Sequence, residues 1–399
     1  MEPQTTLRGP NTKDLLVYMV KVTGICLGLF LLTELTGLLV VPARYRNPPP
    51  VTADAWIHSD ALGGTERLWL EEFVDEFCRS YTARWTSYLY FRREPFAGRH
   101  INIDSAGRRS TPQFTGDDGQ RNPAIFLLGG STMWGTGARD SNTIPAALAR
   151  LIASRPGERR MRVVNMGESG YVSTQSLLAL ELELRRGNIP DDVILYDGIN
   201  DVFAAYQNNE AGLPQNEHNR ATEFNLLQSG GRMLGLGMND LWKRTVTAGM
   251  VGAARDLILG PPPAHAPPPQ HRLAADVVRL YRGNLEILDA LSRHYGFRYR
   301  AYWQPVVFSK RDPSPYELKQ SEKMEHVRQL YLEVYRRVAA DSTLRANPSF
   351  RNLSGIFDGS GPVYLDFCHV TERANGIIAA QLCTDLFGRE RILQTAYVP

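Results

Sequence analysis

A serine, a histidine and an aspartate in this chain have the types and spacing of a nucleophile, a general base and the group that orients that base. Ser131 follows two glycines, in the run AIFLLGGSTMWGTG. His369 lies three residues after Asp366, in the tetrapeptide DFCH. A serine hydroxyl is a weak nucleophile until a base takes its proton, and a carboxylate that binds the imidazole Nδ1–H fixes the tautomer of that base. The three residues therefore predict acyl transfer through Ser131.

Acyl transfer also requires hydrogen-bond donors that face the oxyanion of the tetrahedral intermediate. The candidates are the backbone N–H groups of Ser131 and Gly170 and the side-chain amide of Asn200, from the segments NMGESG and GIND. A glycine at position 170 lets the backbone approach the substrate closely, and the amide of Asn200 supplies N–H donors without a charge. We expect these three groups to form an oxyanion hole.

The elements that position these residues alternate between strands and helices, which predicts an α/β fold with a parallel sheet. Short apolar runs predict strands at 124–128, 161–164, 193–196 and 299–307, and a short fifth strand near 355–357. Amphipathic segments predict helices at 145–153, 173–186, 316–340 and 371–387, and a long helix that ends at His294. Because open α/β sheets bind ligands at the carboxyl ends of their strands, we expect the functional residues to meet at one edge.

Four motifs in this order resemble those of the SGNH hydrolases, also called the GDSL-like esterases. They end in the nucleophile Ser131, in Gly170 as the sixth residue of NMGESG, in Asn200 of GIND, and in Asp366 and His369 of DFCH. The resemblance covers residues 124–388 apart from 206–270. It implies a three-layer, flavodoxin-like sandwich, a Ser131–His369–Asp366 triad and no cofactor or metal.

Two details qualify this resemblance. Gly130 stands where the family usually has the aspartate of Gly-Asp-Ser, but that position is not a reacting group. The nucleophile elbow of the α/β-hydrolases needs a glycine two residues after the serine, where this chain has Met133. The sequence therefore favours the SGNH family over that fold.

An apolar run near the N-terminus predicts a membrane helix. Residues 22–41 contain one charged side chain, Glu34, and a helix of this length spans about 30 Å, the thickness of a hydrocarbon core. A cleaved signal peptide is the alternative, because Ala43 lies in a small-residue context, but the run exceeds the usual apolar region of a signal. The basic residues before and after the run slightly favour a cytoplasmic N-terminus; they are Arg8, Lys13 and Lys21 before it, and Arg44 and Arg46 after it.

These patterns predict the domain organisation. We expect a cytoplasmic tail at 1–14, a transmembrane anchor at 15–42, and a linker with an aromatic-rich extension at 43–122 that packs on the main domain. The hydrolase domain would occupy 123–399, with an insertion or lid at about 206–270. The catalytic domain would then lie in the periplasm or outside the cell.

Composition excludes several other classes of protein. The chain of 399 residues has a net charge of only +3 and no basic-aromatic stripe, so we expect no nucleic-acid partner. The four cysteines form no C-x-x-C pair and the eight histidines form no H-x-x-x-H pair, so no metal site is predicted. Cys368, beside the predicted base, is interpreted as a small buried side chain, and a bridge from Cys78 stays open.

The expected function is hydrolysis of an O-acyl ester, with an O-acetyl group on a glycan as the first substrate and a lipid ester as the second. An acyltransferase that uses a sugar hydroxyl in place of water is an alternative within the same chemistry. An inactive carbohydrate-binding or assembly module is another, in which Ser131, Asn200 and Asp366 are turn or helix-cap residues and His369 is a core histidine.

Overall fold

The computed structural model describes residues 12–40, 56–113, 123–155, 161–227, 242, 245, 247–248 and 270–388. The first part of the expected linker and extension, residues 43–55, and most of the expected insertion lie outside these residues. The chain forms two compact units. One contains Pro50–Arg220 and Pro267–Pro399, and the other contains Met1–Pro49 and Ala221–Ala266.

A five-stranded parallel sheet is the centre of the larger unit. Its strands are β5 (Ala124–Gly129), β6 (Arg162–Asn165), β7 (Asp192–Asp197), β8 (Arg298–Trp303) and β9 (Phe350–Asn352). The spatial order is β6-β5-β7-β8-β9, and every neighbouring pair is parallel. The predicted α/β class with a central parallel sheet is confirmed. The order is that of a flavodoxin-like fold, and it reverses between β5 and β7, where such sheets bind ligands.

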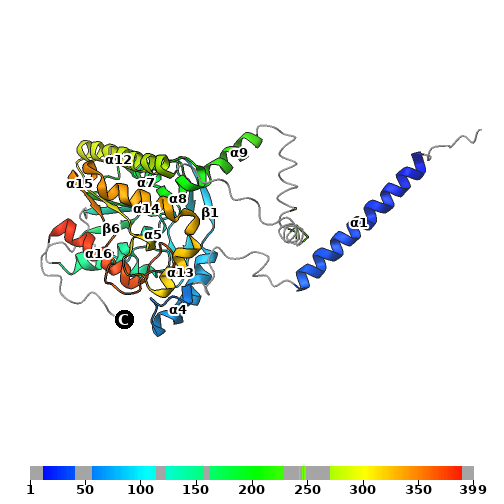
Figure 1. The fold of residues 1–399 in the computed structure, drawn as a ribbon, viewed down its shortest axis with the longest axis horizontal. Coiled ribbons are helices and arrows are strands. Elements are labelled where there is room, and N and C mark those ends of the chain that lie inside the picture. Colours follow the sequence, from blue (N-terminus) through cyan, green and yellow to red (C-terminus); the bar gives the residue numbers. More distant parts are fainter. Residues whose placement is uncertain are drawn as a thin grey trace, which may run out of the picture. The chain divides into compact units, whose positions relative to one another are not determined.

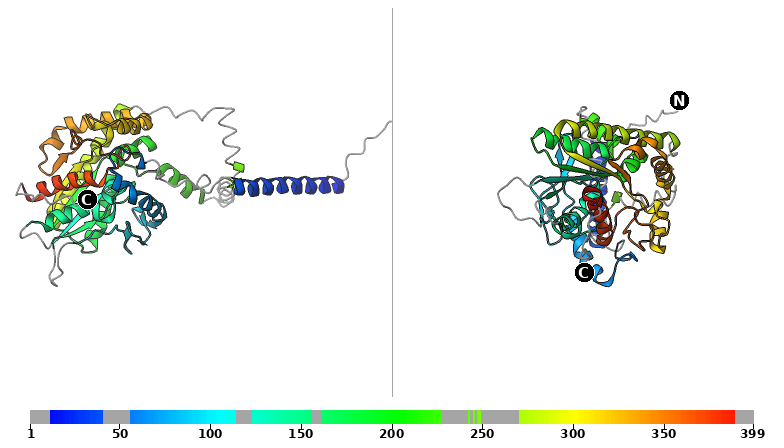
Figure 2. Two further views of the ribbon diagram at one scale, coloured as in Figure 1. Left: turned by 90° about the horizontal axis from the view of Figure 1, so that it is seen from below. Right: turned by 90° about the vertical axis from the view of Figure 1, so that its left-hand side faces the viewer.

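Helices cover both faces of the sheet (Figure 1). One face packs on α7 (Ser173–Arg185), α8 (Ile199–Asn208), α12 (Gln270–Tyr295) and α14 (Glu325–Ala340). The other face packs on α6 (Ile144–Ala153) and α16 (Glu372–Phe387). Figure 2 shows these layers from two further directions, with α16 in red. Shorter helices are α5 (Ser131–Trp134), α9 (Glu217–Leu227), α13 (Pro315–Lys323) and α15 (Ser342–Ala346), with 3₁₀ turns at Asp140–Asn142 and Val307–Ser309.

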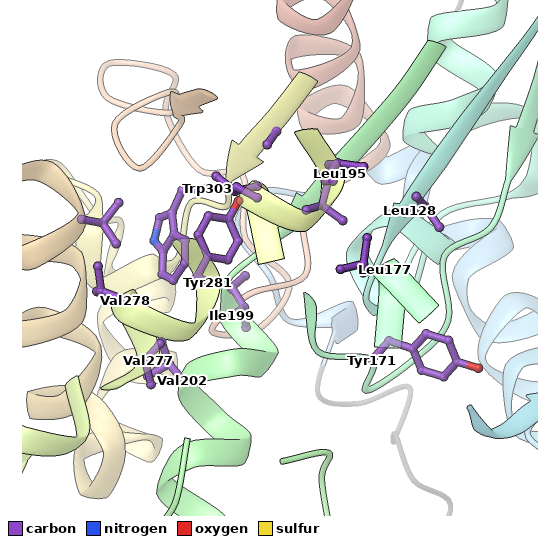
Figure 3. Close-up of a cluster of buried hydrophobic side chains, with 14 of the residues drawn as sticks. Leu128, Tyr171, Leu177, Leu195, Ile199, Val202, Val277, Val278, Tyr281 and Trp303 are labelled. Atoms are coloured by element: carbon purple, nitrogen blue, oxygen red, sulfur yellow. The ribbon is translucent and has the colours of Figure 1, made fainter. Parts of the chain in front are cut away.

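Alternate side chains of each strand enter these two layers, as the pleat requires. Phe126 and Leu128 face the α7–α8–α12–α14 layer, whereas Ile125 and Leu127 face α6 and α16. Every residue of β5 and of β7 is buried, because helices cover both faces. In the first layer the ring of Tyr281 meets the indole of Trp303 edge-on, with 4.9 Å between ring centroids (Figure 3).

The aromatic-rich segment before the sheet is built from one helix and two small hairpins. These are α4 (Gly64–Arg79), the pair β1 (Ala83–Thr86) with β2 (Tyr90–Arg93), and the pair β3 (Phe96–Ala97) with β4 (Asn102–Ile103). Its apolar cluster includes Trp56, Phe73 and Phe77, and also Trp134 and Leu365 from the segments that carry Ser131 and Asp366.

Two predicted elements differ from the structure. The fifth strand is Phe350–Asn352 and not 355–357, where the chain turns through the bond from Ile356 N to Leu353 O. An edge strand of three residues with an exposed Arg351 has no apolar run to reveal it. The predicted helix at 316–340 is two helices, because Met324 adopts φ −108° and ψ 19° between α13 and α14. No glycine or proline marks that break in the sequence.

The second unit contains α1 (Thr12–Val40). Its segment Leu16–Thr36 has a mean hydropathy of 2.0 and is long and apolar enough to cross a membrane, as a signal sequence also can be. Within this unit, the ring of Phe30 stacks on Trp242, and a carboxylate oxygen of Glu34 accepts a hydrogen bond from Thr247 N at 2.8 Å.

Candidate active site

The serine lies where the sequence predicts it, directly after the central strand. β5 ends at Gly129, and Ser131 is the first residue of α5. The segment after β6 continues alongside β5, because Met166 N donates to Leu127 O and Glu168 N donates to Gly129 O. Ser131 is only partly buried, so its hydroxyl lies at the carboxyl edge of the sheet next to the glycine-containing segment.

His369 and Asp366 form a compact turn whose ring reaches the serine. One oxygen of Asp366, Oδ1, accepts from Cys368 N at 2.9 Å and from His369 N at 2.8 Å. The other oxygen, Oδ2, lies 2.7 Å from His369 Nδ1, and His369 Nε2 lies 2.8 Å from Ser131 Oγ. A carboxylate beside Nδ1 places the ring proton there, which leaves Nε2 as the acceptor for the serine hydroxyl.

The charge of Asp366 is maintained in this position. Burial raises the pKa of its carboxyl, but the interaction with His369 and the backbone N–H donors outweigh that effect, so the pKa lies below its usual value. The carboxylate is therefore ionised and can accept the hydrogen bond from His369 Nδ1.

The loop before Asp366 is fixed by a buried glutamate. Glu317 accepts from Val363 N at 2.8 Å and from Tyr364 N at 3.0 Å, and its second oxygen pairs with Lys310 Nζ at 2.7 Å. The side chains of Glu317 and Lys310 are at most 1% exposed. Burial raises the pKa of Glu317, but these bonds reverse the effect and lower it. The buried carboxylate of Glu317 thus accepts backbone N–H groups of the loop that leads to Asp366, as the carbonyl groups of a neighbouring strand would.

The predicted oxyanion donors also lie at this edge of the sheet. Gly170 has φ +79°, a conformation that glycine adopts readily and that other residues disfavour. Asn200, in the first turn of α8, donates from Nδ2 to Tyr171 O at 2.8 Å, directly after Gly170. A Cβ on Gly130 would overlap Asn200 Nδ2, so the amide lies against the residue before Ser131. The structure thus brings Ser131, Gly170 and Asn200 together, and all three are partly accessible.

A buried glutamine, which the sequence analysis did not identify, connects two of these segments. Gln304 donates from Nε2 to Thr132 Oγ1 at 2.6 Å and accepts at Oε1 from Ile199 N at 3.1 Å. It therefore joins the residue after Ser131 to the residue before Asn200. Its own carbonyl accepts from the Tyr335 hydroxyl at 2.8 Å. A polar residue at the end of an apolar strand was the available signal, since Gln304 directly follows β8.

Two arginines of the N-terminal extension hold the glycine-containing segment. Arg92 donates to Met166 O at 3.1 Å, and Arg93 donates to Ser169 Oγ at 2.8 Å. Arg93 Nε also lies 3.5 Å from Glu168 Oε1, in a pair whose side chains are at most 3% exposed. Burial lowers the pKa of Arg93 to about 10 and raises that of Glu168. Spacing along the chain gives no sign of these contacts, because they join residues about 75 positions apart.

Three acidic residues near the motifs are buried in the structure. Glu168, within NMGESG, and Asp197, directly before GIND, are both buried. Asp201 accepts from Ser173 N at 3.2 Å, at the start of α7, and also bonds the backbone N–H groups of Gly198 and Asp201 at the start of its own helix, α8. Cys368 is buried, as expected, and no disulfide joins Cys26, Cys78, Cys368 or Cys383, all of which the structure describes. Asp366, Cys368 and His369 are close enough to share a metal ion, but both ring nitrogens of His369 already face Asp366 and Ser131.

No protein-family model and no curated protein matches the chain. Solved structures of similar fold include the acetyl xylan esterase AlAXEase, with 11% identity, a TM-score of 0.34, and coverage of 66% of this chain and 100% of that one. Another is Axe2, an acetylxylan esterase from Geobacillus stearothermophilus, with 14% identity, a TM-score of 0.34, and coverage of 69% and 97%. A third, from Desulfitobacterium hafniense DCB-2 and assigned to the lipolytic G-D-S-L family, has 9% identity, a TM-score of 0.31, and coverage of 66% and 99%. The function therefore has to be argued from the geometry of the site.

Proposed function

We propose that this protein is a membrane-anchored serine esterase that hydrolyses an O-acyl ester through an acyl-enzyme on Ser131. The observation that supports the proposal is the continuous hydrogen-bonded chain from Ser131 Oγ to His369 Nε2, at 2.8 Å, and from His369 Nδ1 to Asp366 Oδ2, at 2.7 Å. Both distances lie in the range in which a base can take a proton directly. A turn residue and a core histidine would not need this alignment at an accessible sheet edge.

The proposed reaction has two stages. His369 Nε2 takes the proton of Ser131 as its oxygen attacks the ester carbonyl, and Asp366 stabilises the imidazolium. The oxyanion forms next to the N–H groups of Ser131 and Gly170 and the amide of Asn200. His369 then protonates the departing alcohol. A water molecule, deprotonated by the same ring, attacks the acyl-serine carbonyl and releases the acid and free Ser131.

The substrate class follows from the resemblance of the four motifs to the SGNH hydrolases. An O-acetyl group on a glycan is the proposed substrate, and a lipid ester is the second choice. Transfer of the acyl group to a sugar hydroxyl would use the same acyl-enzyme, since only the attacking molecule in the second stage differs.

The proposal is tested with the full-length chain in detergent micelles and p-nitrophenyl acetate as the ester. Ser131→Ala removes the nucleophile, and we expect kcat to fall by about 10⁵-fold or to background. Ser87→Ala, at an exposed serine of the β1–β2 turn, is the matched control and should retain the wild-type rate. Equal rates for the wild type and Ser131→Ala would reject the esterase and favour the inactive binding module.

A second measurement identifies the preferred ester and the molecule that accepts the acyl group. Release of acetate from an O-acetylated oligosaccharide is compared with release of fatty acid from a lipid ester, in the presence and absence of free sugar. Faster deacetylation of the oligosaccharide, independent of added sugar, supports the proposed hydrolase. Acyl transfer that requires the sugar would instead assign the enzyme to the transferases.

A further inference from the structure

A glutamine outside the four motifs contacts the amide of Asn200. Gln215 Nε2 donates to Asn200 Oδ1 at 3.3 Å. The same side chain lies over Gly170, because a Cβ on that glycine would be 3.4 Å from Gln215 Oε1. Gln215 thus bonds one of the three groups proposed to bind the oxyanion and lies beside the residue that carries a second, and it comes from the chain between α8 and α9.

This contact selects one of the two orientations of the Asn200 amide. In the observed orientation Nδ2 donates to Tyr171 O and Oδ1 accepts from Gln215 Nε2. A flipped amide would place Oδ1 against the carbonyl of Tyr171, which is a repulsive contact, and Nδ2 against the N–H donors of Gln215, which would have to turn its own amide away from the observed orientation. Tyr171 O uses one Nδ2 hydrogen, and among the described residues nothing accepts the other. That second hydrogen is the one available to an oxyanion beside Ser131.

The segment that carries Gln215 is held firmly on α8. Gln207 Nε2 donates to Asn216 Oδ1 at 2.7 Å, and Asn216 N donates back to Gln207 Oε1 at 2.8 Å. Asn208 Nδ2 donates to Pro214 O at 2.9 Å. The residues on both sides of Gln215 are therefore tied to the helix whose first turn contains Asn200. Fixed attachment of this kind restricts the glutamine side chain to the neighbourhood of that amide.

We propose that Gln215 is a positioning residue for the oxyanion hole, which holds the amide of Asn200 with Nδ2 toward the oxyanion. The proposal rests on the proposed esterase function. Gln215 acts through Asn200 and does not itself touch the reacting atoms. Its effect belongs to the transition state, where the oxyanion develops, and should therefore appear in kcat and leave KM nearly unchanged.

The first test compares three variants of the full-length chain with p-nitrophenyl acetate. Gln215→Ala removes one neutral hydrogen bond, and we expect kcat to fall by about 2- to 10-fold. Gln215→Glu keeps the size but places acceptors against Asn200 Oδ1 and a charge near the oxyanion, so the loss should be larger, about 10- to 100-fold. Gln381→Ala is the control, because that glutamine lies on α16 and donates to Asp385 of the same helix. An unchanged kcat in Gln215→Glu would overturn the proposal.

A double-mutant cycle separates positioning from general destabilisation. If Gln215 acts through Asn200, then Gln215→Ala should cost nothing further in the Asn200→Ala background. The same fold-loss in both backgrounds would show that Gln215 acts elsewhere, and would overturn the proposal.

A spectroscopic readout decides the proposal without relying on activity. The side-chain ¹H–¹⁵N signals of Asn200 are identified by their loss in Asn200→Ala. We expect these signals to shift in Gln215→Ala and to stay in place in Gln381→Ala. Signals that do not move would overturn the positioning role. If Ser131→Ala proved as active as the wild type, the esterase proposal would fail, and this spectrum would still decide how the amide is held.

Discussion

Asn200 lies against Gly130 because that residue has no side chain. The space that a Cβ at position 130 would need is occupied by Asn200 Nδ2, and the same Cβ would approach Tyr171 O to 3.4 Å. The glycine that departs from the usual Gly-Asp-Ser pattern therefore leaves room for Asn200, the proposed oxyanion donor. Because position 130 has no Cβ, the segment that carries Ser131 and the GIND segment can lie against each other.

Gly130→Ala is expected to push the Asn200 amide away from Ser131. Complete loss of such a donor lowers kcat by about 10²–10³-fold, so partial displacement should lower it by about 10- to 100-fold. The measurement is steady-state kinetics with p-nitrophenyl acetate. Gly376→Ala on α16 is the control, since a Cβ there meets nothing within 4 Å. If Gly130→Ala had the wild-type kcat, Asn200 would not act from its observed position.

At the scale of elements, β5 and β7 and the helices that follow them determine the geometry of the site. Asp201 in the first turn of α8 caps α7 through Ser173 N, and Asn284 of α12 donates to Ser173 Oγ at 2.9 Å. The starts of α7 and α8 and the middle of α12 are therefore joined at one place. Gly170 and Asn200 lie on the two segments that this contact connects, so the relative position of the two donors depends on it.

Most of these elements could be predicted from sequence, and the exceptions have a common cause. The buried strands β5 and β7 and the residues directly after them have local signatures, which are apolar runs, glycines and short polar motifs. Gln215, Gln304 and Arg93 have none, because each acts through contacts made only when distant segments fold together. The edge strand β9 was predicted at the wrong residues for a related reason. It lies at the edge of the sheet beside β8, and its side chains are not buried on both faces, so no apolar run marks it.

A buried carboxyl at the end of β7 gives a prediction on stability. Asp197 is 1% exposed, and burial together with the neighbouring Asp201 raises its pKa well above the usual value. The folded state therefore holds this proton more tightly than the unfolded chain, whose aspartate pKa is about 3.9. Folding is favoured by the protonated group at low pH, and stability falls by about 1.4 kcal/mol per pH unit between the two pKa values.

Asp197→Asn removes this titration while it keeps the size of the side chain. Thermal unfolding of the wild type and the variant is compared between pH 4 and pH 8. The difference in Tm should grow in favour of the variant as the pH rises. Parallel Tm curves over the whole range would mean that Asp197 does not have the raised pKa that its environment gives it.

At the scale of the whole molecule, α1 has an apolar surface that is largely exposed among the described residues, apart from the contact of Phe30 with Trp242. None of its most hydrophobic window is buried, and side chains such as Leu16, Leu29 and Leu32 are about 60% exposed. An apolar surface of this extent is stable in a lipid bilayer and not in water. We therefore propose that the helix is the attachment of the membrane-anchored esterase.

The last prediction is that α1 is retained and that the catalytic unit lies outside the cytoplasm. The mass of the intact protein from membranes should include residues 1–43, and alkaline carbonate should not release it, because a spanning helix inserts in an effectively irreversible way. Alkaline phosphatase fused after Pro399 should be active, since the basic residues before the span favour an inside N-terminus. A mature chain that begins near Arg44 would identify α1 as a cleaved signal. A C-terminal reporter active only in the cytoplasm would reverse the orientation and exclude extracellular glycans as substrates.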